Sequence, residues 1–303
     1  LFAQNYSSPI FDSMPASIAL IIATFLWGSS FIALKYSIEI YDPAFVIFFR
    51  MLVTLVLCLA LWKWVKKFSY QAGDWKYLLS MSIAEPCLYY LFEGNAMKYT
   101  SASQAGVLVS CFPLLVAVVA YFMLKEKLTK PLAIGFSFCI FGSVLLTLVS
   151  ENSSHAPNPL LGNFLEFLAM VCAAYYAVSV KHLSLRYSPL ALIALQGLSG
   201  SIFFAPFLLF IELPTVHDLP ALIGIFYLGA FVTIGAYGMY NYAITKVSVL
   251  TAAAFTNLIP IFTLLLSAII LGESLTALQW GCISLVFLGV YISQKKVRKA
   301  ILS

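Results

Sequence analysis

Apolar runs of about 20 residues follow one another along almost the whole chain, separated by short breaks of proline, glycine and charged residues. A run of that length spans the hydrocarbon layer of a bilayer, about 30 Å, as a single helix. Of the 303 residues, 62% are hydrophobic and only 10% are charged. A water-soluble fold could not cover so much apolar surface, because soluble domains carry roughly 25% charged residues. The sequence therefore predicts an all-α integral membrane protein.

The breaks between the apolar runs predict ten transmembrane helices. These are expected at residues 17–39, 43–64, 75–97, 101–123, 131–149, 160–181, 189–211, 219–244, 248–270 and 277–293. One longer polar connection, 150–159, separates the first five from the last five. The predicted organisation is a polar N-terminal tail at 1–15, a first repeat at 17–149, a second repeat at 160–293, and a basic cytoplasmic tail at 294–303.

The distribution of basic residues predicts the orientation. With the N-terminus in the cytoplasm, nearly all of the 17 lysines and arginines fall on inner loops or on the C-terminal tail. Both termini are therefore expected to be cytoplasmic, in what we expect to be a bacterial inner (plasma) membrane. The net charge of +5 then reflects loop orientation, and nucleic acid is not an expected partner.

Several kinds of chemistry lack the residues that they need. The six cysteines fall inside apolar runs without a CxxC pair or zinc-site spacing, so no metal or cofactor is expected. The three histidines lie in or near predicted loops, and no HExxH motif is present. No Walker motif for ATP is present either. An intramembrane enzyme is therefore the least supported class.

The two groups of five helices show a weak internal repeat. A shift of 147 residues aligns Pro113 with Pro260, Glu126 with Glu273 and Gly142 with Gly289, and a shift of 146 aligns Lys35 with Lys181 and Pro43 with Pro189. Because five is odd, the second copy must cross the membrane in the opposite sense to the first. Inverted repeats of this kind underlie alternating access in many transporters.

Several of these segments form a recognisable pattern. They are the Leu-Trp-Gly-Ser-Ser-Phe stretch at 26–31, Arg50, the run from Asn95 to Gly106, Pro113 with the turn 124–129, and Pro260 with the turn 271–276. In this pattern the chain resembles the EamA group of the drug/metabolite transporter superfamily over essentially its whole length. The resemblance implies ten helices in two inverted five-helix repeats, with a central cavity lined mainly by helices 1, 3, 4, 6, 8 and 9. It also implies transport of amino acids, nucleotides, vitamins or other small metabolites, without specifying which.

Charged side chains inside the predicted helices identify the first candidate site residues. Each costs roughly 2.5 to 3.5 kcal/mol at mid-depth and so requires a partner or a function. They are Lys35, Arg50, Glu85, Glu93 and Glu166. Glu85 is the deepest, and Pro86 after it is expected to loosen the helix. Glu85 can alternate between a proton and a cationic substrate group, or it can be a buried neutral or hydrogen-bonded acid.

The other four charged residues have structural alternatives. Arg50 and Glu93 are expected at similar depth, where they form a structural ion pair or an outer gate. Lys35 lies near the outer end of its helix, so its charge can extend to the interface. Glu166 either packs against the first repeat or lines the cavity.

Aromatic and polar residues at mid-helix positions complete the candidate substrate site. Rings with polar groups suit a cavity for planar or cationic cargo, although packing and lipid contact are the alternatives. These residues are Trp27, Tyr89, Tyr175, Tyr176 and Tyr237, with Tyr240 beside them. Ser110 and Asn257 precede Pro113 and Pro260 by three residues, where they can bind cargo or satisfy a carbonyl that the proline frees.

These observations predict a secondary transporter of small polar metabolites, amino acids or related compounds, working by alternating access. Proton coupling at Glu85 is one option. An uncoupled facilitator and an importer of nucleotide-like or vitamin-like metabolites are the alternatives. The excess of acids over bases in the helices favours zwitterionic or cationic cargo. The expected partners are a small-molecule substrate, membrane lipid and protons, with the chain as a monomer or a weak homodimer.

Overall fold

The structure is a computed structural model that describes residues 14–66, 68–124, 130–150, 153, 155–215 and 217–293. Within these ranges the chain is helical, with two isolated bridges, Phe68 to Tyr187 and Ser153 to Ala156, and no strands. Nearly all of the predicted N-terminal tail at 1–15, the whole basic tail at 294–303, and Glu126 lie outside the described residues.

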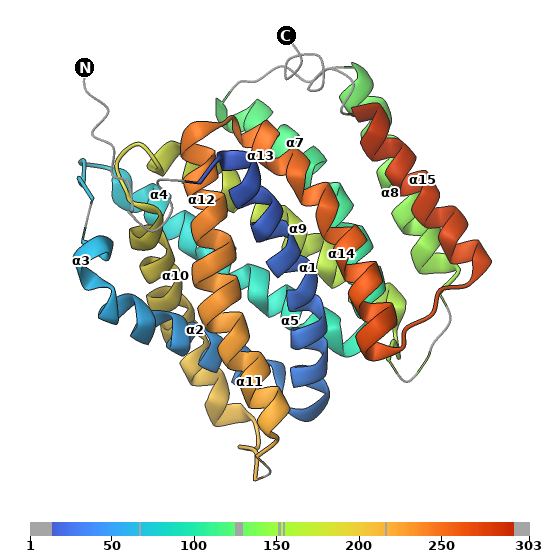
Figure 1. Cartoon of the computed structure of the whole chain (residues 1–303), viewed down its shortest axis with the longest axis horizontal. Coiled ribbons are helices and arrows are strands. Elements are labelled where there is room, and N and C mark those ends of the chain that lie inside the picture. The colour runs from blue at the N-terminus through green and yellow to red at the C-terminus, as the bar shows by residue number, and fades with distance from the viewer. Residues whose placement is uncertain are drawn as a thin grey trace.

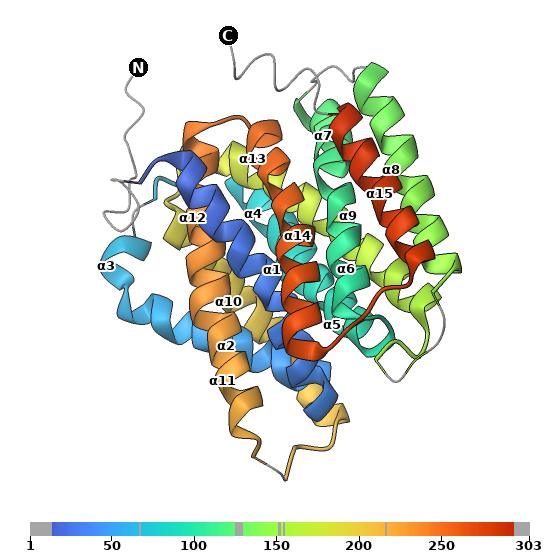
Figure 2. The same cartoon turned by 45° about the vertical axis from the view of Figure 1, so that its right-hand side comes forward.

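The helices pack into one bundle, in which α8 and α15 form a pair along one side (Figures 1 and 2). The first half contains α1 (Ala16–Ile40), α2 (Pro43–Ala60), α3 (Trp62–Val65), α4 (Asp74–Ser82), η1 (Ile83–Leu88), α5 (Tyr89–Tyr99), α6 (Ala102–Leu108), η2 (Val109–Cys111), α7 (Phe112–Leu124) and α8 (Lys130–Leu148). The second half contains α9 (Pro159–Leu183), α10 (Pro189–Phe204), η3 (Ala205–Phe210), α11 (Leu219–Tyr227), η4 (Leu228–Ala236), α12 (Tyr237–Lys246), α13 (Val249–Phe255), η5 (Thr256–Leu258), α14 (Ile259–Leu266), η6 (Ser267–Leu271) and α15 (Ala277–Ser293).

Four of these helices begin in the same way. A polar residue accepts a hydrogen bond from a backbone N–H of the first turn, and a proline follows it within that turn. The capping residues are Asp42, Asn158, Ser188 and Asp218. Proline suits this position because the first turn has free N–H groups that no helical carbonyl can satisfy. These local signals fix where α2, α9, α10 and α11 begin.

Seven helices among the described residues are long and apolar enough to cross a membrane. They cover 16–40, 43–60, 102–123, 159–183, 189–210, 219–246 and 249–271. Two shorter apolar helices cover 133–148 and 277–292. The helix predicted at 75–97 is interrupted, because Glu85 has non-helical backbone angles (φ −146°, ψ 118°) directly before Pro86. Helix length and composition thus identify seven candidate spans rather than the ten predicted.

The 147-residue repeat appears as a set of reciprocal contacts between α8 and α15. A Cβ on Gly142 would meet Cys282 and Val286, and a Cβ on Gly289 would meet Gly135 and Cys139. Adding 147 to 135, 139 and 142 gives 282, 286 and 289, so each contact is the counterpart of the other. Cys139 also donates a hydrogen bond to the carbonyl of Val286, its own equivalent, at 3.3 Å.

A second self-matching pair lies deeper in the bundle. The hydroxyl oxygens of Tyr90 and Tyr237 are 3.3 Å apart, and 90 plus 147 is 237. A residue can contact its own equivalent only near the axis that relates the two halves. An approximate two-fold axis therefore passes between α8 and α15 and between these two tyrosines.

The crossing of α8 and α15 gives a stability prediction. Gly289→Ala places a Cβ 2.6 Å from the backbone carbonyl oxygen of Gly135, so the helices must separate. We expect a loss of about 1–3 kcal/mol in the free energy of unfolding, measured by denaturant titration in detergent. Gly281→Ala is the matched control in α15, because a Cβ there meets nothing within 4 Å. Equal effects of the two substitutions would contradict the close crossing.

Candidate functional site

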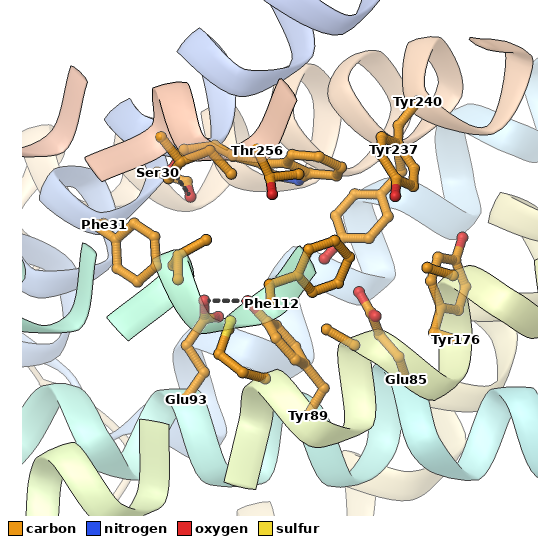
Figure 3. Close-up of a pocket in the computed structure, with 16 residues that line it drawn as sticks. Ser30, Phe31, Glu85, Tyr89, Glu93, Phe112, Tyr176, Tyr237, Tyr240 and Thr256 are labelled. Carbon is orange, nitrogen blue, oxygen red and sulfur yellow. Dashed lines mark hydrogen bonds between the residues drawn. The ribbon is translucent and has the colours of Figure 1, made fainter. Parts of the chain in front are cut away.

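A cavity lined by 16 residues lies in the centre of the bundle. Its lining comes from α1, η1, α5, η2, α7, α9, α12, η5 and α14. In the numbering of the predicted helices these are helices 1, 3, 4, 6, 8 and 9, which agrees with the lining expected from the resemblance. The walls are mainly apolar and aromatic, with a few polar groups (Figure 3).

Glu85 enters this cavity from the interruption between α4 and α5. The side chain is buried, with the residue 1% exposed, and Figure 3 shows its carboxylate directed into the cavity. The hydroxyl of Tyr237 lies near the carboxylate. Oxygen Oε1 has no hydrogen-bond partner among the described residues. Glu85 therefore offers the site a buried acceptor that can bind a proton or a ligand.

Arg50 and Glu93 form the ion pair considered in the sequence analysis. Arg50 Nη1 lies 3.9 Å from Glu93 Oε2, and both side chains are almost fully buried. The guanidinium also donates to Thr233 Oγ1 at 3.1 Å and lies 4.2 Å from the centre of the Tyr90 ring. Glu93 Oε1 accepts a hydrogen bond from the Tyr89 hydroxyl at 2.6 Å, whereas Oε2 has no hydrogen-bond partner among the described residues. The charge of Arg50 is thus already matched within the protein.

Tyr90 contacts both this pair and Tyr237. Its ring packs against the Arg50 guanidinium, and its hydroxyl donates to that of Tyr237, which in turn lies near Glu85. The two tyrosines therefore lie between the Arg50 guanidinium and the carboxylate of Glu85. They are the tyrosine pair on the two-fold axis.

The opposite wall of the cavity is aromatic. The ring of Trp27 lies 5.1 Å from that of Tyr237 and 5.0 Å from that of Tyr240, between centroids, and Tyr176 lies 5.9 Å from Tyr237. Asn241 fixes Tyr176 through a hydrogen bond between Nδ2 and the tyrosine hydroxyl oxygen at 2.9 Å. The indole N–H of Trp27 and the hydroxyl of Tyr240 have no partner in the part of the chain that the structure describes.

The repeat explains why the two walls differ. The 147-residue shift aligns Glu93 with Tyr240 and Glu85 with Val232, and the 146-residue shift aligns Arg50 with Gln196. The first half therefore supplies all three of these charges. The second half supplies an aromatic, an aliphatic and an amide side chain at the equivalent positions.

Several candidates from the sequence lie outside the cavity lining. Tyr175 donates to Ser80 at 2.9 Å, on another face of α9 from Tyr176. Asn257 donates to the carbonyl of Ala254, although its neighbour Thr256 does line the cavity. Ser110 is fully buried with no hydrogen-bond partner among the described residues. Glu166 is also buried, and neither of its carboxylate oxygens has a partner in the described ranges.

Lys35 caps a helix end instead of facing the cavity. Its ammonium donates to the carbonyls of Met97 and Thr100, at the end of α5, and to that of His155, at 2.7 to 3.1 Å. Lys181 makes the equivalent contacts with Ile244 and Val247 at the end of α12. A cation at a helix C-terminus satisfies free carbonyls and matches the helix dipole. The two lysines are aligned by the 146-residue shift of the internal repeat, and so their contacts are equivalent in the two halves.

Sequence reasoning missed nine of the 16 lining residues, among them Ser30, Phe31, Phe112 and Thr256. Ser30 and Phe31 belong to the stretch at 26–31 that carries the family resemblance, which is a signal that could have identified them. Phe112 and Thr256 carry no such signal, because an apolar or hydroxyl residue in a membrane helix is ordinary.

Glu273 joins the two halves at the end of the bundle where α5 passes into α6. Its two carboxylate oxygens accept hydrogen bonds from the backbone N–H groups of Ala102 and Ser103, each at 2.9 Å. Ser103 Oγ also lies 2.7 Å from Ser267 Oγ. A Cβ on Gly106 would lie 2.6 Å from a side-chain carbon of Thr263, so α6 and α14 touch directly. This contact closes the bundle at that end.

Comparison with protein families finds a match to the EamA-like transporter family at residues 14–148 and again at 160–294. The chain is 27% identical to the uncharacterized transporter YetK of Bacillus subtilis, covering 94% of this chain and 88% of that one. It is 28% identical to an uncharacterized transporter of Archaeoglobus fulgidus, covering 92% and 98%. It is 24% identical to a WAT1-related chloroplastic protein of Arabidopsis thaliana, covering 90% and 68%.

Among solved structures, one crystal structure matches this fold with a TM-score of 0.66 and 18% sequence identity. The match covers 94% of this chain and 98% of the other. At this identity the similarity concerns the arrangement of the helices.

Proposed function

Because the chain belongs to the EamA-like transporter family, we propose that it is a secondary transporter of small polar metabolites, amino acids or related compounds, that works by alternating access with proton exchange at Glu85. The family and the seven apolar helices identify it as an integral membrane transporter and not as an enzyme. We further propose that the chain crosses the membrane ten times, through the seven candidate spans, α8, α15, and the interrupted segment from α4 to α5.

The proposed arrangement has two inverted repeats at 17–149 and 160–293. Both termini are cytoplasmic, the membrane is a bacterial inner membrane, and the chain works as a monomer or a weak homodimer. In this orientation the contact between Glu273 and α6 lies at the outer end. The predominance of basic residues at the opposite end supports this assignment.

One observation carries the proposed exchange site: Glu85 places an unpartnered carboxylate oxygen in the central cavity. A buried charge without a partner is costly, so the carboxylate favours binding either a proton or a cation. Mutual exclusion of the two at one group links an outward movement of one to an inward movement of the other. A single group that binds either a proton or the substrate is the minimum that coupled exchange requires.

The two-fold relation supports the alternating step. The closed contact between α6 and α14 involves unlike segments of the two halves, so it is not on the axis. The equivalent contact at the other end would pair α13 with α7, which also lie against each other. Closing one contact while the other opens exposes the central cavity to one side at a time.

Counterflow in proteoliposomes tests the function. Vesicles containing the purified protein are loaded with an unlabelled mixture of amino acids and amines, and entry of each labelled compound is followed with and without a pH gradient. We expect transient accumulation of at least one compound. Accumulation should be greater when the pH gradient drives protons in the direction opposite to the movement of the compound. An exchange rate that does not change with the pH gradient would support an uncoupled facilitator. Failure of every compound to enter, with protein-free vesicles as the baseline, would contradict the proposal.

A further inference from the structure

The cavity is lined by acidic side chains and, among the described residues, by no basic ones. Among the described residues that line it, the charged side chains are Glu85 and Glu93, and no lysine, arginine or histidine is present. Glu93 is paired with Arg50 and hydrogen-bonded to Tyr89. Glu85 has no ion pair among the described residues, so it is the lining acid that is most available to a cationic ligand.

The cations Arg50, Lys35 and Lys181, which lie outside the lining, are already bound by groups of the protein. Arg50 is held by Glu93, Thr233 and the Tyr90 ring. Lys35 and Lys181 each cap the carbonyls of a helix end. A ligand carboxylate or phosphate would thus find no free cation in the lining and would lie in the same low-dielectric space as Glu85. An unpaired buried anion beside a like charge is strongly disfavoured.

The aromatic wall favours the opposite charge. Trp27, Tyr176, Tyr237 and Tyr240 form a continuous group of rings through the contacts described above, and Tyr237 also lies near the Glu85 carboxylate. Ring faces attract ammonium groups, most strongly where water is excluded. The cavity thus combines a carboxylate on one wall with ring faces on the other, which is the arrangement that binds a monovalent organic cation.

Two unpartnered polar atoms indicate what the rest of the ligand offers. The indole N–H of Trp27 can only donate a hydrogen bond, and the hydroxyl of Tyr240 can donate or accept one. Neither carries a full charge. They suit a neutral hydroxyl, ether or amide oxygen, whereas a carboxylate would require a cation as well.

We propose that the substrate is a small organic ammonium ion without a free carboxylate, such as an aromatic monoamine or an amino-acid amide. This rests on the proposed function and selects, from amino acids and related compounds, those that carry a positive charge alone. The ammonium binds between Glu85 and the ring group, and the neutral polar end meets Trp27 and Tyr240. Zwitterionic amino acids and anionic nucleotides bind much less well.

Matched pairs of compounds test this inference in the counterflow assay. Tyramine, tyrosine amide and tyrosine share one ring and one amino group, and only tyrosine adds a carboxylate. We expect tyramine and tyrosine amide to compete with a labelled amine at least tenfold better than tyrosine does. Equal or stronger competition by tyrosine would overturn the inference while leaving the proposed transport intact. If none of the compounds moves in any assay, the proposed function itself fails.

A ring variant separates cation binding from general packing. In Trp27→Leu we expect binding of phenethylamine to weaken about threefold to tenfold, and binding of the neutral analogue 2-phenylethanol to change less than twofold. Competition in the counterflow assay measures both. Tyr175→Phe is the control, because that hydroxyl contacts Ser80 outside the cavity. Equal weakening of amine and alcohol would show that the rings act only by packing and would overturn their cation-binding role.

Discussion

Glu85→Gln is expected to reduce exchange of a cationic substrate by about 10- to 100-fold and to leave a residual exchange that no longer depends on pH. A hydrogen bond to a charged group contributes about 1.5–3 kcal/mol, and the amide removes the charge while keeping nearly the same shape. In the unchanged protein, protons compete with the substrate for the same carboxylate, so exchange falls as the pH falls. Glutamine cannot take up that proton, and the profile becomes flat. Initial rates of counterflow between pH 5 and 8, at several substrate concentrations, measure both effects.

Two further variants test whether the effect belongs to this position. Glu85→Asp keeps the carboxylate and is expected to retain a pH-dependent profile with a weaker apparent affinity. Glu212→Gln removes an exposed carboxylate far from the cavity lining and is expected to behave as the unchanged protein. If Glu85→Gln keeps the original pH profile, proton exchange does not occur at Glu85, whatever its effect on affinity.

A disulfide between residues 103 and 267 is expected to stop exchange, because it joins α6 to the start of η6 across the two halves. The serine oxygens are 2.7 Å apart, so Ser103→Cys with Ser267→Cys brings two thiols into reach of each other. Oxidation is expected to lower counterflow to less than a tenth of the reduced rate, and reduction with dithiothreitol restores it. The reason is that alternating access requires this contact to open once in every cycle.

The control uses an equally short contact that does not join the two halves. Ser248 Oγ and Thr251 Oγ1 also lie 2.7 Å apart, at the start of a single helix, α13. Oxidation of Ser248→Cys with Thr251→Cys is expected to leave exchange nearly unchanged. The two single variants at 103 and 267 control for the native cysteines. Full exchange by the oxidised 103–267 pair, with cross-linking verified by mass spectrometry, would mean that this end stays closed during transport.

The sequence predicted the features that depend on local chemistry or on spacing. The breaks of proline, glycine and charged residues predicted the starts of α2, α9, α10 and α11 to within one residue, and the 147-residue repeat aligned Gly142 with Gly289, whose contacts in the structure are reciprocal. Pro86 pointed to the interruption beside Glu85. It did not reveal that the interruption would divide a predicted span into two short helices.

Features that depend on the direction of a side chain could not be predicted in the same way. Tyr175 and Tyr176 are neighbours with the same side chain, yet their positions on a helix differ by about 100° and only Tyr176 lines the cavity. Lys35 lies near a helix end, where extension to the interface is the ordinary expectation. Its actual partners come from segments 62 to 120 residues away.

The pair formed by Tyr90 and Tyr237 has a mechanical consequence. When two similar halves exchange conformations that are related by a common axis, the residues on that axis move least. Both tyrosines lie on the axis and close to Glu85. The proposed binding group therefore lies where the movement is smallest, and the two ends of the bundle move furthest. A substrate held there stays on the same partners through the cycle, and only its path to water changes.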